Sequence, residues 1–286
     1  MVNFTYDISK YEPRQMVALP VAMLVIATLF LAFNTISTGM PVEPGIDFAG
    51  GVAVTLFTDD SREEIKAYFS DYSLKSVGES LNDGRYLVFD YMDDKQFREL
   101  TGKVMDRYPD AKIDQIGETF GKSLQTQALW ALLFSFIGMG VVVFIAFKTI
   151  IPSVAVVISA FSDIVITAAF MNIFGITLSL GTTAALLMLI GYSVDSDILL
   201  TTRLLKRKGK TDEKMQGAFR TGFIMTTTTL TAIAAMFVVS AIGQVTIIRD
   251  ISAVLLIGLV VDLMNTWMLN AGLLKWYVKK GKGDAK

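Results

Sequence analysis

Long runs without charged residues constrain this chain most strongly. A helix needs about 20 predominantly apolar residues to cross the hydrocarbon core of a bilayer. Helices are favoured there because they satisfy their own backbone N–H and C=O groups without water. The sequence therefore predicts a multi-pass α-helical membrane protein with six transmembrane helices. The six runs are residues 16–36, 124–147, 151–174, 176–201, 222–242 and 251–273.

The distribution of Lys and Arg over the short connecting segments predicts the orientation. Four segments on one side carry 15 of these residues, whereas the short loops on the other side carry only Arg249. Positive charge in short loops marks the cytoplasmic side. We therefore expect a protein of the cell membrane with both termini in the cytoplasm. The basic segments are the tail 1–15, the turn at Lys148, the loop 202–221 and the tail 274–286.

Residues 37–123 are too polar for the membrane and are predicted to form one exported α+β domain. Strand-like runs at 46–57, 74–78, 86–91 and 111–116 alternate with two helical segments. The helices open at a capping box, Ser61 to Glu64, and at the N-cap Asp93. The turn Asn82-Asp83-Gly84 favours a hairpin between the second and third strands. The resulting order, βαββαβ, is that of a ferredoxin-like domain.

The composition excludes several kinds of site. The chain has no Cys and no His, so disulfides, thiolate nucleophiles, Ser-His-Asp triads and His- or Cys-ligated metals are all impossible. It also lacks the glycine-rich motifs of nucleotide-binding loops. We expect no cofactor, no metal and no nucleic-acid partner. Any proton chemistry must use carboxylates, Lys or Tyr.

Four carboxylates fall inside the predicted spans, where each charge is costly. Low dielectric favours the neutral form of an acid, so such a residue can take up and release a proton. The alternative is that a protonated Asp simply holds neighbouring helices together through hydrogen bonds. Two of the acids are two residues apart and point about 200° from each other on a helix, so they cannot share one environment. The four acids are Asp163, Asp195, Asp197 and Asp262.

Three motifs together resemble the SecF family of protein-export membrane proteins. Gly45-Ile46-Asp47-Phe48-Ala-Gly50-Gly51, just after the first span, is similar to that family's G-[IL]-D-F-x-G-G signature. The run 191–197, which holds both acids of the fourth span, resembles the family's fourth-span motif, and Arg203 follows at the matching interval. The run 218–221 and the Thr-rich span after it resemble the opening of the fifth span. The similarity covers essentially the whole chain.

The resemblance implies half of a transporter of the RND (resistance, nodulation and division) type. It also implies a SecD partner beside a SecYEG-type channel, with the translocating polypeptide and membrane lipids as further contacts. It implies a non-enzymatic accessory protein that promotes export or membrane insertion with the proton-motive force. Asp195 and Arg220 are then expected to carry the proton coupling. In many bacterial members the acid lies one residue later, at Ser196 here, and the Asp195 position matches SecD. Asp197 is therefore the alternative coupling acid, and Asp163 and Asp262 have no family role.

The glycine motif is expected to be structural, not catalytic. Gly50 and Gly51 have no Cβ and permit a close backbone contact at the start of a strand. Asp47 is expected to bond a local turn. Two other functions remain as alternatives, an RND-type exporter of small solutes or lipids and an intramembrane aspartyl protease. One exported domain favours the first interpretation over the exporter, and the missing Gly-x-Gly-Asp signature disfavours the protease.

Overall fold

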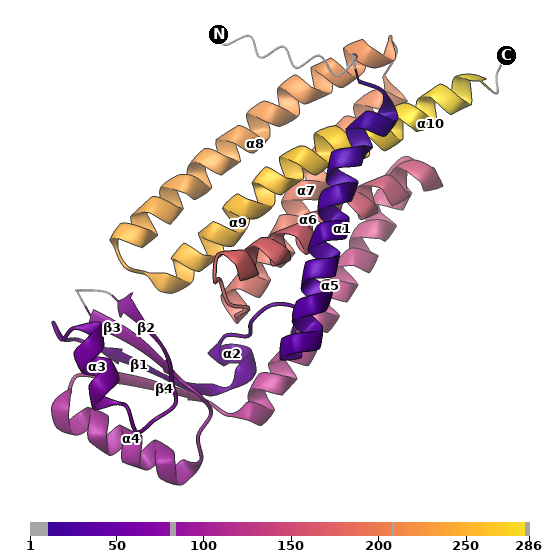
Figure 1. Cartoon of the computed structure of the whole chain (residues 1–286). Coiled ribbons are helices and arrows are strands. Elements are labelled where there is room, and N and C mark those ends of the chain that lie inside the picture. Colours follow the sequence, from indigo (N-terminus) through magenta and orange to yellow (C-terminus); the bar gives the residue numbers. More distant parts are fainter. Residues whose placement is uncertain (1–10, 81–83, 208, 284–286) are drawn as a thin grey trace.

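The protein consists of a helical bundle with a small α/β domain at one end (Figure 1). The computed structural model describes residues 11–80, 84–207 and 209–283. Within these residues, five helices are long and apolar enough to cross a membrane. They are α1 (Pro13–Thr38), α5 (Glu118–Phe147), α6 (Ile150–Ile173), α7 (Leu180–Lys206) and α8 (Thr211–Ile242).

The sixth predicted span, 251–273, is not one regular helix. It comprises most of α9 (Thr246–Met264), a π-helical segment η2 (Asn265–Asn270) and the start of α10 (Ala271–Gly283). In α9 alone, 19 residues long, Arg249, Asp250 and Asp262 interrupt the apolar sequence. The prediction of an uninterrupted span is therefore corrected here. Single π-turns inside α-helices are frequent at functional sites.

Several helices extend past the apolar runs that predicted them. Helix α7 continues to Lys206 and α8 begins at Thr211, so most of the predicted loop 202–221 is helical. Helix α5 likewise begins at Glu118, six residues before the run 124–147. Lys, Arg, Gln and Glu are good helix formers. The apolar pattern marks only the part suited to lipid, whereas the helix itself propagates into the polar flanks.

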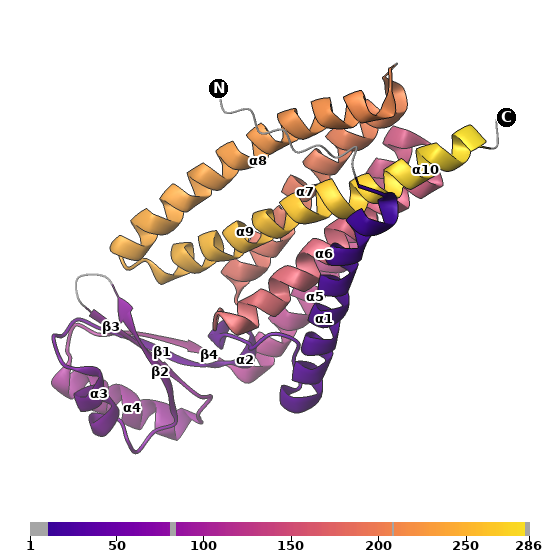
Figure 2. The same cartoon turned by 45° about the horizontal axis from the view of Figure 1, so that its top comes forward.

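Helices α6, α7 and α9 form the centre of the bundle. Helix α9 packs against α6, α7 and α8, while α1 lies along α6 and η2, and α5 lies against α6 and α7. The start of α1 and the end of α10 lie at the end of the bundle opposite the α/β domain, in both views (Figures 1 and 2). This arrangement surrounds the inner faces of α6, α7 and α9 with protein.

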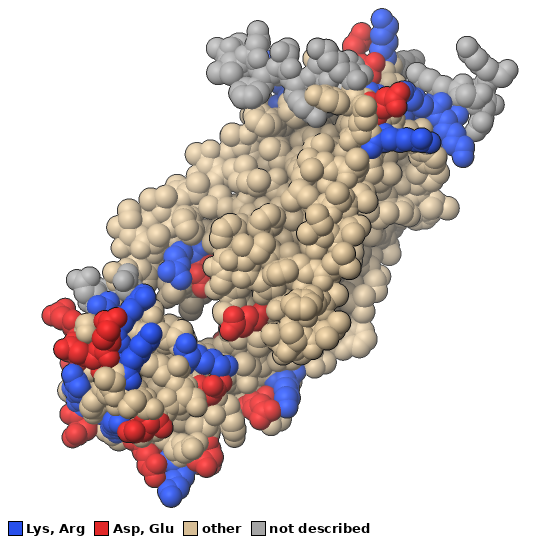
Figure 3. Space-filling view, viewed as in Figure 1, with Lys and Arg blue, Asp and Glu red and all other residues tan. Residues whose placement is uncertain are grey.

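The surface separates into charged ends and an apolar belt. Figure 3 shows Lys, Arg, Asp and Glu gathered over the α/β domain and over the opposite end of the bundle, with a mostly uncharged belt between them. Large apolar side chains are exposed along this belt, for example Phe33, Leu129 and Val239. Such a continuous apolar surface is suited to lipid and to partner helices.

The α/β domain confirms the predicted βαββαβ order. Its sheet has the strand order β2-β3-β1-β4, and every adjacent pair is antiparallel. Side chains of the strands and both helices enclose one apolar core, which includes Phe69, Leu87 and Leu100. The elements are β1 (Gly51–Leu56), α3 (Arg62–Tyr68), β2 (Leu74–Ser80), β3 (Gly84–Phe89), α4 (Asp94–Arg107) and β4 (Lys112–Ile116).

The predicted helix starts are confirmed, and one strand is corrected. Ser61 and Asp93 each cap a helix through a reciprocal capping box. Strands β2 and β3 form the expected antiparallel pair, while the predicted turn residues Asn82 and Asp83 lie outside the described residues. The strand predicted over 46–57 begins only at Gly51. The preceding residues form a helical turn, α2 (Ile46–Ala49), because they contact α5 and α7 instead of a neighbouring strand.

Candidate functional site

Three of the four predicted intramembrane acids lie together inside the bundle. Asp163 on α6, Asp197 on α7 and Asp262 on α9 are each at most 1% exposed. Within the described residues, no Lys or Arg forms an ion pair with any of them. Polar side chains supply the contacts instead. The site therefore holds three buried carboxyl groups without a compensating cation.

Asp163 is bonded at both carboxylate oxygens. The Ser193 hydroxyl of α7 donates to its Oδ2 at 2.6 Å, and the Asn265 amide of η2 donates to its Oδ1 at 2.7 Å. The same amide nitrogen reaches the Ser162 hydroxyl at 3.0 Å. This group joins α6, α7 and the π-helix through buried hydrogen bonds, an arrangement that fixes their relative positions.

Asp197 and Asp262 are joined through Thr266. The Thr266 hydroxyl lies 2.9 Å from Oδ1 of Asp197 and 3.1 Å from Oδ1 of Asp262. The Asn270 amide also donates to Oδ1 of Asp197, at 2.7 Å. Residues of α7, α9 and η2 therefore meet in one polar network in the middle of an otherwise apolar bundle.

The sequence analysis missed the neutral members of this network. A signal was present, since Asp262, Asn265, Thr266 and Asn270 are spaced 3, 4 and 8 residues from the first and lie on one helical stripe. Ser193 and Asp197 are four residues apart and share a face of α7 in the same way. A polar stripe within an apolar span would have pointed to a buried network.

The structure places Asp195 and Arg220 differently. Asp195 lies on the exposed face of α7, and Arg220 is exposed on α8. Neither makes a hydrogen bond or ion pair within the described part of the chain. The expected desolvation of Asp195 is thus absent in this chain alone, because the turn of two residues that buries Asp197 turns Asp195 outward. The Arg203 guanidinium instead binds α8, at the Gly217 carbonyl and the Thr221 hydroxyl.

The glycine motif connects the α/β domain to the bundle. Oδ2 of Asp47 accepts a hydrogen bond of 2.9 Å from the backbone N–H of Leu180, at the first turn of α7. Asp47 thus caps a helix 133 residues away and not a local turn, which corrects the sequence prediction. The Gln125 amide of α5 donates to the Phe48 carbonyl. Contacts of this segment hold the domain against the start of the helix that carries Asp197.

Comparisons with known proteins agree on the family. The family model for the C-terminal part of the protein-export membrane proteins SecD and SecF matches residues 96–280. The chain is 71% identical to a protein-export membrane protein SecF of Methanolacinia petrolearia, over 98% of this chain and 99% of the relative. It belongs to the SecF family. A SecF of Haloferax volcanii is 44% identical over 98% of this chain and 99% of the relative.

The fold is also shared with a solved structure. The crystal structure of SecDF, a translocon-associated membrane protein from Thermus thermophilus, superposes with a TM-score of 0.71 at 21% identity. It covers 93% of this chain, and the chain spans 38% of the length of that SecDF. The SecF family consists of export membrane proteins and not of enzymes. The interpretation as an intramembrane protease is therefore abandoned, and the chain is a multi-pass membrane protein.

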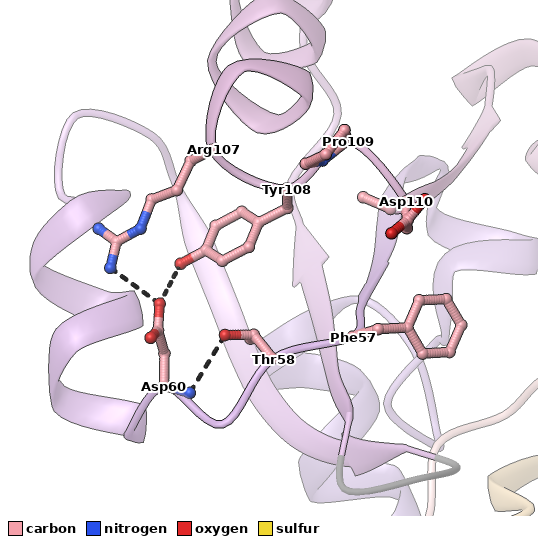
Figure 4. Close-up of a pocket in the computed structure, with 8 residues that line it drawn as sticks. Phe57, Thr58, Asp60, Arg107, Tyr108, Pro109 and Asp110 are labelled. Atoms are coloured by element: carbon pink, nitrogen blue, oxygen red, sulfur yellow. Dashed lines mark hydrogen bonds and ion pairs between the residues drawn. The ribbon is translucent and has the colours of Figure 1, made fainter.

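A pocket in the α/β domain of this SecF-family chain is built from groups that already bond one another. Figure 4 shows Asp60 accepting from Tyr108 at 2.6 Å and from Arg107 at 2.8 Å, while its own backbone N–H donates to Thr58. The hydrogen bond from Tyr108 lowers the pKa of Asp60, and desolvation raises the pKa of Tyr108 well above its ordinary value of 10.0. These side chains connect the β1–α3 loop to α4, and we interpret the pocket as structural.

Acidification is expected to weaken this domain. The pKa of Asp60 lies below its ordinary value of 3.8, and hydrogen bonds from Ser61 hold the pKa of Glu64 below 4.5. A carboxylate with a lowered pKa stabilises the fold above the unfolded value and loses that contribution as pH falls through the folded value. Amide hydrogen exchange of residues 51–116 in the intact chain should therefore accelerate below about pH 4.

An Asp60→Asn variant provides the control for this pH dependence. It is expected to exchange faster than the parent protein at neutral pH, because the charge-assisted bonds to Tyr108 and Arg107 are weakened. Its further acceleration on acidification should be smaller, since one of the two titrating groups is gone. Equal acid sensitivity of the variant and the parent would contradict the role assigned to Asp60.

Proposed function

We propose that this chain is an accessory subunit of the Sec machinery that acts with a SecD partner to promote protein export or membrane insertion. The partner relation is supported by the SecDF fold, of which this chain covers only part. A SecYEG-type channel, the translocating polypeptide and membrane lipids complete the expected surroundings. The proton-motive force supplies the energy.

The observation that carries the energy source is the set of uncompensated carboxyl groups inside the bundle. Asp163, Asp197 and Asp262 are buried at the level of the apolar belt, and the sequence has neither a nucleotide-binding motif nor any His or Cys. Buried ionisable groups in membrane helices mark ion and proton pathways far more often than neutral positions do. Proton binding is the chemistry that this residue set supports.

The coupling pair is proposed to be Asp195 and Arg220, with Asp197 as the alternative acid. Asp195 is exposed on α7, so a partner helix must cover it before it becomes desolvated. Arg220 cannot lose its proton and acts as a charge that favours ionised Asp195 when the two approach. Movement of α8 relative to α7 would then govern proton release, and Asp47 at the start of α7 would transmit the movement to the α/β domain.

Six spans with both termini in the cytoplasm complete the proposal, the sixth being α9 with η2 and the start of α10. The absence of Cys makes labelling of single introduced cysteines clean. Asp114→Cys, on exposed β4, is expected to react with an impermeant thiol reagent added outside intact cells. Lys210→Cys, between α7 and α8, should react only after the membrane is opened. The reverse pattern would overturn the orientation.

Co-purification from native membranes tests the function itself. A tagged copy of this chain should recover a second, homologous six-span chain in fixed stoichiometry, and depletion of either should slow export of secreted proteins. Recovery of this chain without such a partner, with unchanged protein export and impaired efflux of a small solute or lipid, would instead favour an RND-type exporter.

A further inference from the structure

The Thr266 hydroxyl contacts two carboxyl groups but has only one hydrogen to donate. Its Oγ1 lies 2.9 Å from Asp197 and 3.1 Å from Asp262, and both distances are those of O–H···O hydrogen bonds or slightly longer. An ionised carboxylate can only accept a hydrogen bond. If both acids were ionised, one contact would place two acceptors together without a proton. One of the two acids must therefore donate its own O–H to Thr266.

No other group in the described structure replaces that proton. The remaining titratable group at the site is Asp163 of α6, which is itself acidic. Lys275 of α10 is directed to the Tyr11 carbonyl at 3.1 Å and to Asp212 at 4.0 Å. The sequence of α8 has no charged residue between 221 and 242, and that of α1 has none between 15 and 38. A pair of anions here would be left without a counter-charge, at a cost of several kcal/mol per ion.

Unpartnered atoms at the same place give independent support for a bound species. Oδ2 of Asp197, Oδ2 of Asp262 and Oδ1 of Asn270 are buried and have no hydrogen-bond partner within the described residues. Asn270 is fully buried, and its amide nitrogen is already directed at Asp197 at 2.7 Å. Buried polar atoms are normally satisfied. The carboxyl groups thus have free acceptor capacity where a proton can be held.

We propose that Asp197, Thr266 and Asp262 form a proton-binding site within this chain, in which two carboxyl groups hold one proton through the Thr266 hydroxyl. One acid donates to Thr266 Oγ1, and the Thr266 hydrogen is donated to the other. Release breaks one carboxyl O–H bond and passes H⁺ to water, leaving two carboxylates that compete for a single hydroxyl hydrogen. This site goes beyond the proposed coupling pair, since Asp195 faces the opposite side of α7 and needs a partner chain.

The site lies in the π-helix, and its protonation state is therefore expected to affect the packing of η2. Trp267, next to Thr266, is 3% exposed and packs edge-to-face on Phe219 of α8, with ring centroids 5.0 Å apart. A Cβ on Gly222 of α8 would lie 2.5 Å from the same indole, so the two elements are in close contact. Two repelling carboxylates beside Thr266 would shift η2, and Trp267 would report the change.

Infrared spectroscopy of the full chain in lipid nanodiscs tests the bound proton. At neutral pH the parent protein should show the C=O stretch of a neutral carboxylic acid, shifted in D₂O and lost on alkalinisation. The double variant Asp197→Asn/Asp262→Asn should lose this band, whereas Asp114→Asn, at an exposed acid of β4, should keep it. Absence of the band from the parent, or its full persistence in the double variant, would overturn the proposal.

Thr266 variants test whether the hydroxyl connects the two acids. Thr266→Val is nearly isosteric but has no hydroxyl, so it should shift the band and the pH at which the band disappears. Thr266→Ser should restore both. If Thr266→Val leaves the frequency and the pH midpoint unchanged, a proton shared through Thr266 is excluded. Neither result depends on export activity, so this proposal and the proposed function can fail separately.

Fluorescence and sodium complete the test. With Trp130→Phe and Trp276→Phe, Trp267 remains as the single Trp of the chain. Its emission should change with the same pH midpoint as the infrared band, and an emission constant through that midpoint would contradict coupling to η2. Exchange of choline for Na⁺ at constant ionic strength should leave the band intact. Loss of the band in Na⁺ would mean that the site holds a metal cation and would overturn the assignment to a proton.

Discussion

Asp195→Asn is expected to abolish the part of export that depends on a proton gradient, while the folded protein and its complex with SecD persist. Asn has nearly the same shape as Asp but cannot bind and release a proton. Asp195 is exposed on α7, so its replacement removes no internal contact of this chain. The measurement is secretion of a reporter protein in membrane vesicles with and without an imposed gradient.

Arg220→Ala should cause nearly the same loss, and the double variant should be no worse than either single one, because the two residues act as one unit. Glu213→Gln, at an exposed acid on the same helix α8, is the matched control and should export normally. If Asp195→Asn exports normally and Asp197→Asn fails, the role belongs to Asp197. If neither matters in the gradient-dependent assay, proton coupling through α7 is wrong.

Much of the fold could be predicted from the sequence because its signals are local. Charge-free runs located the membrane helices, and the capping boxes at Ser61 and Asp93 located both helices of the α/β domain. The extent of α7 and α8 could not be predicted, since hydropathy stops at the membrane boundary and helix propensity does not. The helical turn α2 also escaped, because its conformation depends on contacts with α5 and α7 that are distant in sequence.

The site was only half predictable for a similar reason. The cost of burying a carboxylate is visible in sequence, and it identified Asp163, Asp197 and Asp262. Which side of α7 faces the bundle depends on tertiary packing, and the family motif pointed to Asp195 instead. The π-helical turn changes the register between Asp262 and Asn270, and the apolar pattern contains no sign of it. Sequence thus indicated the acids, and only packing distinguished the inward from the outward ones.

The second large effect is expected at Gly51, where Gly51→Ala should prevent stable folding of the α/β domain. A Cβ there would lie 2.5 Å from the carbonyl oxygen of Phe89, a backbone atom of the neighbouring strand that cannot turn away. The backbone also has φ = 143°, which L-residues rarely adopt. Such strain costs about 1–3 kcal/mol, and overpacking adds a similar amount. Together they are a large fraction of the roughly 5–15 kcal/mol that stabilises a domain.

Protease resistance of residues 51–116 in the intact, membrane-embedded chain measures this effect, together with the amount of protein recovered with SecD. Gly102→Ala is the matched control, because a Cβ at that position of α4 meets nothing within 4 Å. It should be neutral or stabilise the domain by about 0.5–1 kcal/mol, as Ala does for Gly inside helices. A Gly51→Ala protein that folds and assembles normally but does not support export would show that the motif contacts the translocating chain or the channel directly.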